Sequence, residues 1–320
     1  MSALRFAILG KSPLIAQRCQ ALTRHPDTQI AKTLSSAQVA ELDEAGWSAL
    51  LDRSVIDAVV LDLPLADAAA ITLRALHAGI HVLSEMPGAL TVEEIIDLRQ
   101  AERESSGILK FGTPLRYHSS VRAAADLVRA RPYGELLTAR AIYGHAGYPG
   151  ASAREHGILL GHGVQMLDLL HLFCGPFEQV KAMTANGEEA GANLFAMLKS
   201  GAGAVAQLHA SATSWRQTFR LELGYEQGYV WLDGHLPGME GYGPEMLIHA
   251  QVKRDASGAP LANPDETVTE HTAQQAADLE LAEFVSAITG AGPLRGGTSH
   301  QAFDAINATH RIAAAADAWN

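Results

Sequence analysis

Cysteine is scarce in this sequence, with only Cys19 and Cys174 among 320 residues. Neither belongs to a Cys-x-x-Cys or Cys/His spacing, so the pattern excludes a disulfide-stapled scaffold and a zinc finger. Two isolated thiols are typical of a chain that folds in a reducing compartment. The first strand-like run begins at Leu4, so we expect no secretory signal sequence and a cytoplasmic location.

Basic charge is also limited, because 24 Lys and Arg residues stand against 35 Asp and Glu residues, for a net charge of −11. Nucleic acids and anionic membranes are bound by clusters of Lys and Arg, so this balance argues against both as partners. No uncharged run approaches the roughly 18 apolar residues that a membrane-spanning helix needs. The length of 320 residues favours two domains over one.

The first 118 residues alternate between short apolar runs and helical segments, which predicts a doubly wound parallel sheet. From Ser119 onward, strand-like runs follow one another with few helices between them, which predicts a mainly antiparallel sheet. We expect strands at 4–9, 29–34, 56–63, 80–83, 108–111, 135–143, 177–183, 193–199, 204–212, 219–224, 229–232 and 245–252. We expect helices at about 14–25, 66–78, 91–104, 121–131, 156–175, 272–289 and 299–319.

The predicted fold class is therefore α/β with two domains. Residues 1–118 form an N-terminal Rossmann-type domain with a doubly wound parallel sheet, and the C-terminal helix at 298–320 packs back on it. Residues 119–297 form an α+β domain with a mainly antiparallel sheet.

A strand, a tight turn and a helix open the chain, as in a dinucleotide-binding unit. Gly10 stands at the first glycine of the G-x-G-x-x-G fingerprint, but Ser12 and Ile15 replace the second and third. This loss leaves open whether a cofactor occupies the site. The predicted cofactor is NAD(P), held in this domain by Gly10, Ser12, Pro13, Leu14, Ser35, Ser36 and Pro64.

The end of the second predicted strand bears on the choice of cofactor. Ser35 and Ser36 stand where an NAD-binding site has an acidic residue for the ribose. Two serines could face a 2′-phosphate, which favours NADP slightly. The alternative is that they cap the next helix.

The predicted helix at residues 156–175, HGILLGHGVQMLDLLHLFCG, carries polar and very small residues among apolar ones. An α-helix turns about 100° per residue, so Gly161 and Gln165 lie within about 40° of each other, with His162 on the adjoining stripe. Gly161 and Gly163 cost about 1 kcal/mol each relative to alanine, so we expect a backbone or a ligand to approach them closely. The alternative is a buried core helix with a satisfied histidine.

The order of these signals resembles, over nearly the whole chain, the glucose–fructose oxidoreductase, inositol dehydrogenase and MocA (Gfo/Idh/MocA) family of NAD(P)-dependent oxidoreductases. Residues 78–87, AGIHVLSEMP, are similar to the family's AGKHVLxEKP segment, and residues 163–170, GVQMLDLL, to its GVHxxDLL helix. Residues 111–118 and 133–136 resemble the family's segment after the last parallel strand and its entry to the antiparallel sheet. The resemblance implies a homodimer or homotetramer formed through that sheet.

Three positions that carry chemistry in the family differ here, so the active site is atypical. Met86, Gly161 and Gln165 stand where members have a lysine, an aspartate and a histidine. Methionine has no proton to give and a glutamine amide does not titrate, so neither can act as a general base. Leu65 also replaces an asparagine that often follows the third-strand proline.

By resemblance, the protein transfers a hydride to or from a small polyhydroxylated or carboxylated substrate. His162 is the predicted replacement base, because it lies one helical turn from Gln165 and an imidazole titrates near neutral pH. Gln165 could hold a substrate oxygen, and Arg116 would suit a carboxylate. The residues expected near the substrate are Arg116, Tyr117, His118, His145, His156 and Asp168.

The turn after the fourth predicted strand is expected under the nicotinamide, with Glu85, Met86 and Pro87 as cofactor-binding residues. No metal is predicted, since the spacing of the histidines sets no coordination geometry. A metal shared by His145, His156 and His162 is the minor alternative. The losses at the catalytic positions leave a second function open: a non-redox descendant of the family, acting as a ligand sensor, a partner subunit or a cofactor-independent enzyme using the same cleft.

Overall fold

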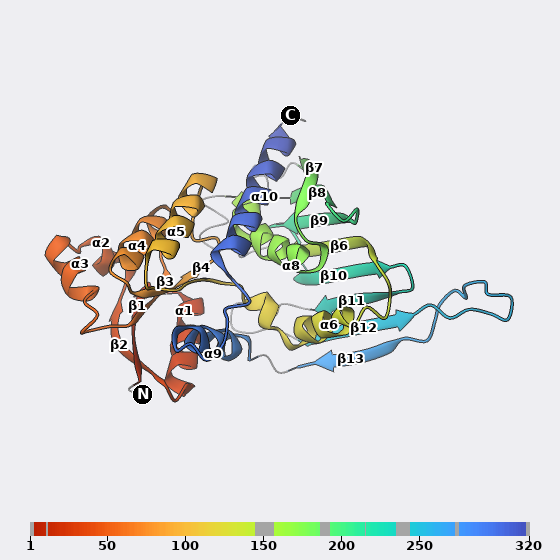
Figure 1. The fold of residues 1–320 in the computed structure, drawn as a ribbon. Helices are drawn as coiled ribbons and strands as arrows, with labels where there is room; N and C mark the ends of the chain where they lie inside the picture. The colour runs from red at the N-terminus through yellow and green to blue at the C-terminus, as the bar shows by residue number, and fades with distance from the viewer. Residues whose placement is uncertain are drawn as a thin grey trace. The chain divides into compact units, whose positions relative to one another are not determined.

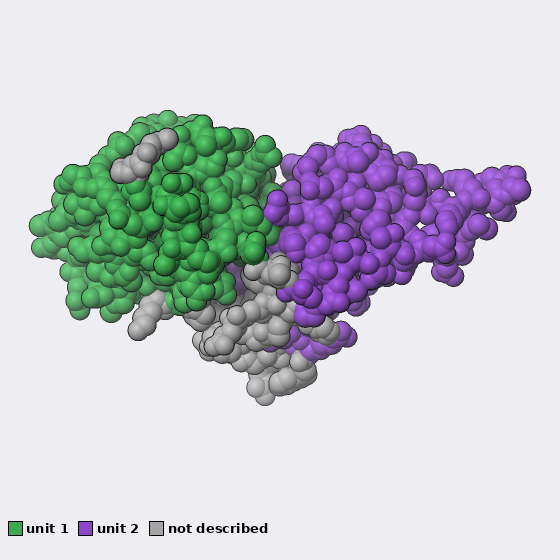
Figure 2. Space-filling model, turned by 90° about the horizontal axis from the view of Figure 1, so that it is seen from below, with its two compact units in different colours: residues 1–117, 275–307 green, residues 118–274, 308–320 purple. Residues whose placement is uncertain are grey.

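The computed structural model describes residues 3–10, 12–144, 157–185, 193–214, 216–234, 244–272 and 275–317, without the side chains of Pro13 and His162. The chain divides into two compact units, shown in different colours in Figure 2. The first unit contains residues 1–117 and 275–307, and the second contains residues 118–274 and 308–320.

A five-stranded parallel sheet forms the centre of the first unit, in the order β2-β1-β3-β4-β5 (Figure 1). The strands are β1 (Leu4–Gly10), β2 (Thr28–Leu34), β3 (Ala58–Asp62), β4 (His81–Glu85) and β5 (Leu109–Gly112). All but β2 are mostly buried, as in a sheet covered on both faces, whereas β2 is an exposed edge strand. The predicted parallel sheet is confirmed.

Helices cover both faces of this sheet, because successive strand residues point to opposite sides. On one face, Phe6 of β1 packs against Phe284 of α9, with ring centroids 6.4 Å apart. On the other face, Leu9 of β1 joins a core with residues of α4 and α5. The helices of this unit are α1 (Pro13–Arg24), α2 (Ser36–Ala40), α3 (Glu44–Leu50), α4 (Leu65–His77), α5 (Val92–Glu104), the 3₁₀ turn η1 (Pro114–Tyr117) and α9 (Ala276–Ile288).

The units divide the chain differently from the predicted domains at two helices. Helix α9 lies in the first unit, because Leu281 and Phe284 complete the core beneath β1. Helix α10 (Ser299–Asp317) is shared: Ala302 and Ile306 join the core of the first unit, whereas Arg311 donates to the carbonyl of Phe177 in the second, at 2.6 Å. A helix's own apolar pattern does not state which sheet it will cover, so this division was not readable from the sequence.

The second unit is built on an eight-stranded sheet in the order β13-β12-β11-β10-β6-β9-β8-β7 (Figure 1). All neighbouring strands are antiparallel except β6 and β9, which are parallel, so the predicted mainly antiparallel sheet is confirmed. The strands are β6 (Leu136–Gly144), β7 (Phe177–Ala185), β8 (Asn193–Ser200), β9 (Val205–Ser211), β10 (Thr218–Tyr225), β11 (Gly228–Gly234), β12 (Glu245–Gln251) and β13 (Thr267–His271). Strand β13 is additional to the prediction.

One face of this sheet is covered by α6 (Ser119–Arg129) and α8 (Val164–Cys174). The predicted helix over 156–175 is not one uninterrupted α-helix, because η2 (Leu159–Gly163) is a π-helix that precedes α8. The N–H of Val164 bonds to the carbonyl of Leu159, five residues back. The wider turn changes the angular relation expected between residues 161 and 165. Such π turns are frequent at functional sites.

No helix in the part of the chain that the structure describes is both long and apolar enough to cross a lipid bilayer.

Candidate functional site

The carboxyl edge of the five-stranded sheet is the candidate site in the first unit. The strand order reverses between β1 and β3, and open parallel sheets bind ligands outside the carboxyl ends of the strands at such a reversal. Gly10, Asp62, Glu85 and Gly112 end β1, β3, β4 and β5 at this edge. Two of these residues are glycines, which let neighbouring groups approach the backbone closely. The other two are acids, which give the edge negative charge.

Gly10 is required by the packing of β1 on β3. Its φ of +129° is a conformation that L side chains rarely adopt, and an added Cβ would lie 2.1 Å from the carbonyl oxygen of Asp62. The first fingerprint glycine therefore has a structural cause in this chain before any ligand is considered.

Ser12, at the position of the second fingerprint glycine, caps the N-terminus of α1 with its side chain. Its hydroxyl accepts a hydrogen bond from the N–H of Ile15 at 3.2 Å and donates one to the Asp62 carboxylate. Burial raises the pKa of Asp62, while the Ser12 hydrogen bond and the charge of Arg18 act in the opposite direction.

This edge meets the main requirement for binding a dinucleotide, which is a helix N-terminus that can receive the diphosphate. The first turn of the twelve-residue helix α1 carries no acidic side chain, and N–H groups at a helix N-terminus attract phosphate. The difference from an ordinary fingerprint is that Ser12 already binds one of these N–H groups and brings the carboxylate of Asp62 beside it.

Glu85, at the end of β4, forms a bidentate ion pair with Arg18 of α1. The Arg18 Nε lies 2.7 Å from Oε1 and Nη2 lies 3.2 Å from Oε2. The remaining Nη1 lies 2.5 Å from Glu280 of α9, and both of these side chains are almost fully buried. An added Cβ on Gly112 would lie 2.2 Å from Glu85, so this glycine makes room for the pair. Burial raises the pKa of Glu85 and Arg18 opposes it.

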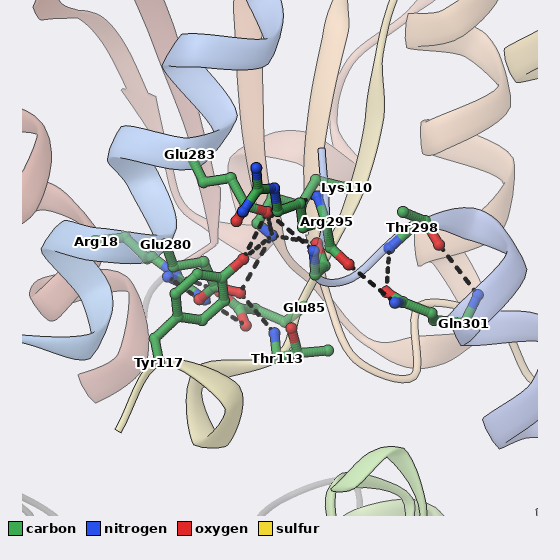
Figure 3. Close-up of polar contacts among 11 residues, drawn as sticks. Arg18, Glu85, Lys110, Thr113, Tyr117, Glu280, Glu283, Arg295, Thr298 and Gln301 are labelled. Atoms are coloured by element: carbon green, nitrogen blue, oxygen red, sulfur yellow. Dashed lines mark hydrogen bonds and ion pairs between the residues drawn. The ribbon is translucent and has the colours of Figure 1, made fainter. Parts of the chain in front are cut away.

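Lys110 extends the buried network on the next strand (Figure 3). Its ammonium group donates to the Tyr117 hydroxyl at 2.8 Å and to the carbonyl of Gly296. Glu283 accepts from the Tyr117 hydroxyl at 2.8 Å and from the N–H groups of Arg295 and Gly296 at 3.0 and 2.9 Å. Burial lowers the pKa of Lys110, and burial with the nearby glutamates raises that of Tyr117. Tyr117, predicted to bind substrate, thus has its hydroxyl engaged inside the first unit.

Sequence reasoning missed Arg18, Lys110, Glu280 and Glu283. A partial signal was present, because Lys110 stands between Leu109 and Phe111 in a run that reads as a buried strand. A charge in such a run implies a buried partner. The partners lie in α9, far along the chain, so no spacing rule could have named them.

The turn after β4 is held by apolar packing. Met86, at the family's lysine position, packs against the core of the first unit, and Pro87 is buried after a cis peptide bond. An added Cβ on Gly88 would lie 2.4 Å from the ring of Phe111. Leu65, at the asparagine position, is buried at the start of α4. These side chains line the core rather than offer polar groups.

The other predicted cofactor residues lie at the same edge or near it. Ser35 caps α2 in a capping box with Gln38, whose side-chain oxygen accepts from the Ser35 N–H at 2.9 Å, as the alternative interpretation expected. Ser36 is the first residue of α2, half-buried. Pro64 precedes α4 and is exposed, and Leu14 is half-buried in α1.

In the second unit, the predicted substrate residues separate into buried and accessible ones. His118 is fully buried, with Nδ1 2.6 Å from Glu245, whose second oxygen accepts from Ser120. This pair ties α6 to β12 and encloses the His118 side chain within the second unit. Asp168 is also buried, on α8. Gln165 is half-buried, and among the described residues its side-chain oxygen has no hydrogen-bond partner.

His145 and His156 lie outside the described residues, and of His162 only the backbone, in the π turn, is described. Arg116 is half-buried in η1, directly after β5. Within the described ranges, no three His, Cys, Asp or Glu side chains gather as metal ligands would.

Two family models match the chain. One, described as an oxidoreductase family with an NAD-binding Rossmann fold, matches residues 5–113, and the other, described as the GFO/IDH/MocA C-terminal domain, matches residues 121–231. Among known proteins, the dTDP-3,4-didehydro-2,6-dideoxy-alpha-D-glucose 3-reductase of Streptomyces violaceoruber is 30% identical over 274 residues, which cover 77% of each chain.

Solved structures share the fold. UDP-N-acetylglucosamine 3-dehydrogenase from Acidithiobacillus ferrooxidans aligns with a TM-score of 0.80 at 19% identity, covering 100% of this chain and 99% of its own. A variant of a 3-ketoreductase from Actinomadura kijaniata, in complex with TDP-benzene and NADP, aligns with a TM-score of 0.75 at 20% identity, covering 98% of both chains.

Replacing Arg18 with methionine should lower the free energy of unfolding by about 3–5 kcal/mol, because it leaves Glu85 buried without its cation and Glu280 with only Lys110 among the described cations, at 3.9 Å. Arg24→Met is the matched control: Arg24 also lies on α1 and pairs with α9, at 2.7 Å from Asp278, but both side chains are exposed. Its loss should cost no more than about 1 kcal/mol. Urea unfolding followed by circular dichroism measures both, and equal losses would contradict a special role for the buried pair.

Proposed function

The chain belongs to the Gfo/Idh/MocA family of NAD(P)-binding oxidoreductases, and on this premise we propose that it reduces the ketone of a nucleotide-linked keto sugar, or oxidises the corresponding alcohol. The observation that carries the proposal is the likeness to a sugar-nucleotide 3-reductase over 77% of both chains. This substrate class lies within the polyhydroxylated or carboxylated substrates that the family resemblance implies.

The residues of the first unit would hold the cofactor at the carboxyl edge of its sheet. The diphosphate would lie over the start of α1, beside Gly10 and Ser12, and the nicotinamide over the turn formed by Glu85, Met86 and Pro87. When bound, the reduced cofactor supplies the hydride that reduction of a ketone requires. Arg18 fixes the end of β4 through Glu85 and thereby sets the position of this turn.

The proton and the substrate oxygen would be handled by side chains of the second unit. Reduction of a ketone needs a proton at the oxygen, and His162 would donate it and take it back in the reverse direction. The Gln165 side chain, whose oxygen has no partner among the described residues, would hold a substrate hydroxyl. Arg116, which belongs to the first unit, would bind an anionic group of the substrate, a phosphate or a carboxylate.

The test is consumption of NADPH or NADH on addition of a dTDP-linked 3-keto sugar, followed by absorbance. His162→Ala should lower kcat by about 100-fold or more, because a general acid typically contributes that much. His300→Ala, which removes an exposed histidine of α10, should leave the rate unchanged.

Cofactor binding without turnover, on this and on related keto sugars, would reject the reductase. It would favour the non-redox descendant that the replacements at Met86, Gly161 and Gln165 left open.

The end of β2 favours NADP as the cofactor, since Ser35 and Ser36 place no carboxylate where a 2′-phosphate would lie. Ser36→Asp should weaken NADPH binding by about tenfold, which corresponds to about 1.4 kcal/mol, and leave NADH binding within about twofold. Ser36→Asn is the neutral control of nearly the same shape. Fluorescence titrations of the wild type and both variants with each cofactor measure these effects, and an equal loss for both cofactors would contradict the assignment.

The open face of the eight-stranded sheet is proposed as the interface of a homodimer. At its β7–β8 end, Met183, Phe195 and Met197 line a depression of about 130 Å³, and both methionines are nearly half exposed. At its β11–β13 end, Trp231 and Val268 are exposed as well. An apolar face of this kind marks a protein interface. The family resemblance implies that the partner is a second copy of the chain.

The centre of the same face carries charge pairs that suit self-association. Arg140 lies 3.1 Å from Glu222, and Arg220 lies 2.5 Å from Asp233 on the neighbouring strands. Both signs occur within one patch, so the patch can meet a copy of itself across a two-fold axis.

Met197→Glu should convert the dimer to a monomer, because it places a charge in the apolar part of the interface. Ile96→Glu, at an equally exposed apolar position on α5 of the first unit, should leave the assembly intact. Sedimentation velocity distinguishes the two species. A wild-type chain that is monomeric at micromolar concentration would reject the interface.

A further inference from the structure

Asp62 occupies the place at the candidate edge where a dinucleotide's diphosphate approaches the protein. It ends β3 at the reversal of the strand order, and its backbone lies against Gly10, with no room for a side chain between them. Its carboxylate accepts from Ser12, the residue that caps α1. The carboxylate therefore lies beside the N–H groups on which phosphate binding at a helix start depends.

The described charged groups around Asp62 give its carboxylate little compensation. Arg18 is the cation that acts on it from α1, but its guanidinium is already bonded to Glu85 and Glu280. Glu85, from β4, carries the same charge as Asp62 and interacts with it unfavourably. Among the described residues, Ser12 donates the one hydrogen bond that this carboxylate accepts. Lys11 lies outside the described residues.

A diphosphate would add further negative charge at this position. An ionised carboxylate beside it repels the phosphate oxygens, and partial burial makes that repulsion less screened than at the surface. A protonated carboxyl group removes the charge and supplies an O–H that can donate to a phosphate oxygen. Burial already favours this protonated form.

We propose that Asp62 takes up a proton when the dinucleotide binds, so that cofactor affinity falls as the pH rises. The inference rests on the proposed function, since it concerns the cofactor of that reaction. Asp62 thus influences cofactor affinity separately from Gly10 and the start of α1.

The first measurement is the dissociation constant of NADPH as a function of pH, by fluorescence titration of the full chain. Binding linked to one proton raises Kd by up to about tenfold for each pH unit above the titration of the free protein's carboxyl group. The phosphate at the 2′ position of NADPH titrates itself near neutral pH. NADH lacks this phosphate, so the same slope with NADH assigns the proton to the protein.

Asp62→Asn should abolish the slope and bind both cofactors more tightly than the wild type at alkaline pH. Asp67→Asn is the matched control, because it removes the same charge from an exposed residue in the first turn of α4. It should keep the wild-type slope. Calorimetry in buffers of different ionisation enthalpy should record net proton uptake for the wild type and less for Asp62→Asn.

Ser12→Ala is a second variant in case Asp62→Asn does not fold. It removes the hydrogen bond that stabilises the charged carboxylate, so the pH at which affinity begins to fall should move upward. A flat wild-type profile, or an Asp62→Asn profile with the wild-type slope, would overturn this inference and leave the proposed function standing. Failure to bind either cofactor at any pH would reject the proposed function itself, and this inference with it.

Discussion

The first unit depends most on the ion pairs of the buried Arg18 guanidinium. The guanidinium joins α1 to the end of β4 through Glu85 and to α9 through Glu280, so three elements distant in sequence meet at one buried side chain. A buried ion pair repays the loss of hydration only when its geometry is good and its remaining polar atoms are bonded. The bidentate contact with Glu85 and the bond from the Thr113 N–H to Glu280, at 2.6 Å, satisfy part of this requirement, whereas Arg18 Nη1 and Glu280 Oε2 meet as an ion pair without hydrogen-bond geometry. The turn after β4 is consequently fixed by α1 and α9 as well as by its own packing.

The same network explains why the candidate edge is acidic. Two of its described cations, Arg18 and Lys110, are turned toward the glutamates of α9 and the groups bonded to them. Glu283 is satisfied by the Tyr117 hydroxyl and by two N–H groups before α10. Asp62 interacts electrostatically with Arg18 and Glu85 of this network and accepts a hydrogen bond from Ser12. The stability of the unit and the charge at its ligand edge are thus set by one group of side chains.

The sequence was sufficient for the fold and insufficient for the site. Mostly apolar runs at β1, β3 and β4 indicate a sheet buried on both faces, and alternating runs after Ser119 indicate a sheet with one open face. Periodicity is local, however, so it could not show that α9 packs beneath β1 or that β6 and β9 run parallel. It also treats a helix as uniform and therefore missed the π turn before α8. His118 was expected near substrate because it follows a parallel strand, but Glu245, far along the chain, holds it inside the second unit.

The replacements at the family's polar positions follow a common physical logic. By resemblance, a lysine at position 86 would bring a cation to this edge, where it could neutralise a phosphate or a carboxylate. Met86 packs on the core instead, so position 86 brings no positive charge to this edge. Arg18 cannot replace it, because burial and two carboxylates hold its guanidinium inside the unit. With the lysine absent, the repulsion between Asp62 and a bound diphosphate is relieved most directly by a proton on Asp62 itself. The loss of one cation and the presence of one partly buried acid at the same edge are therefore two parts of one electrostatic arrangement.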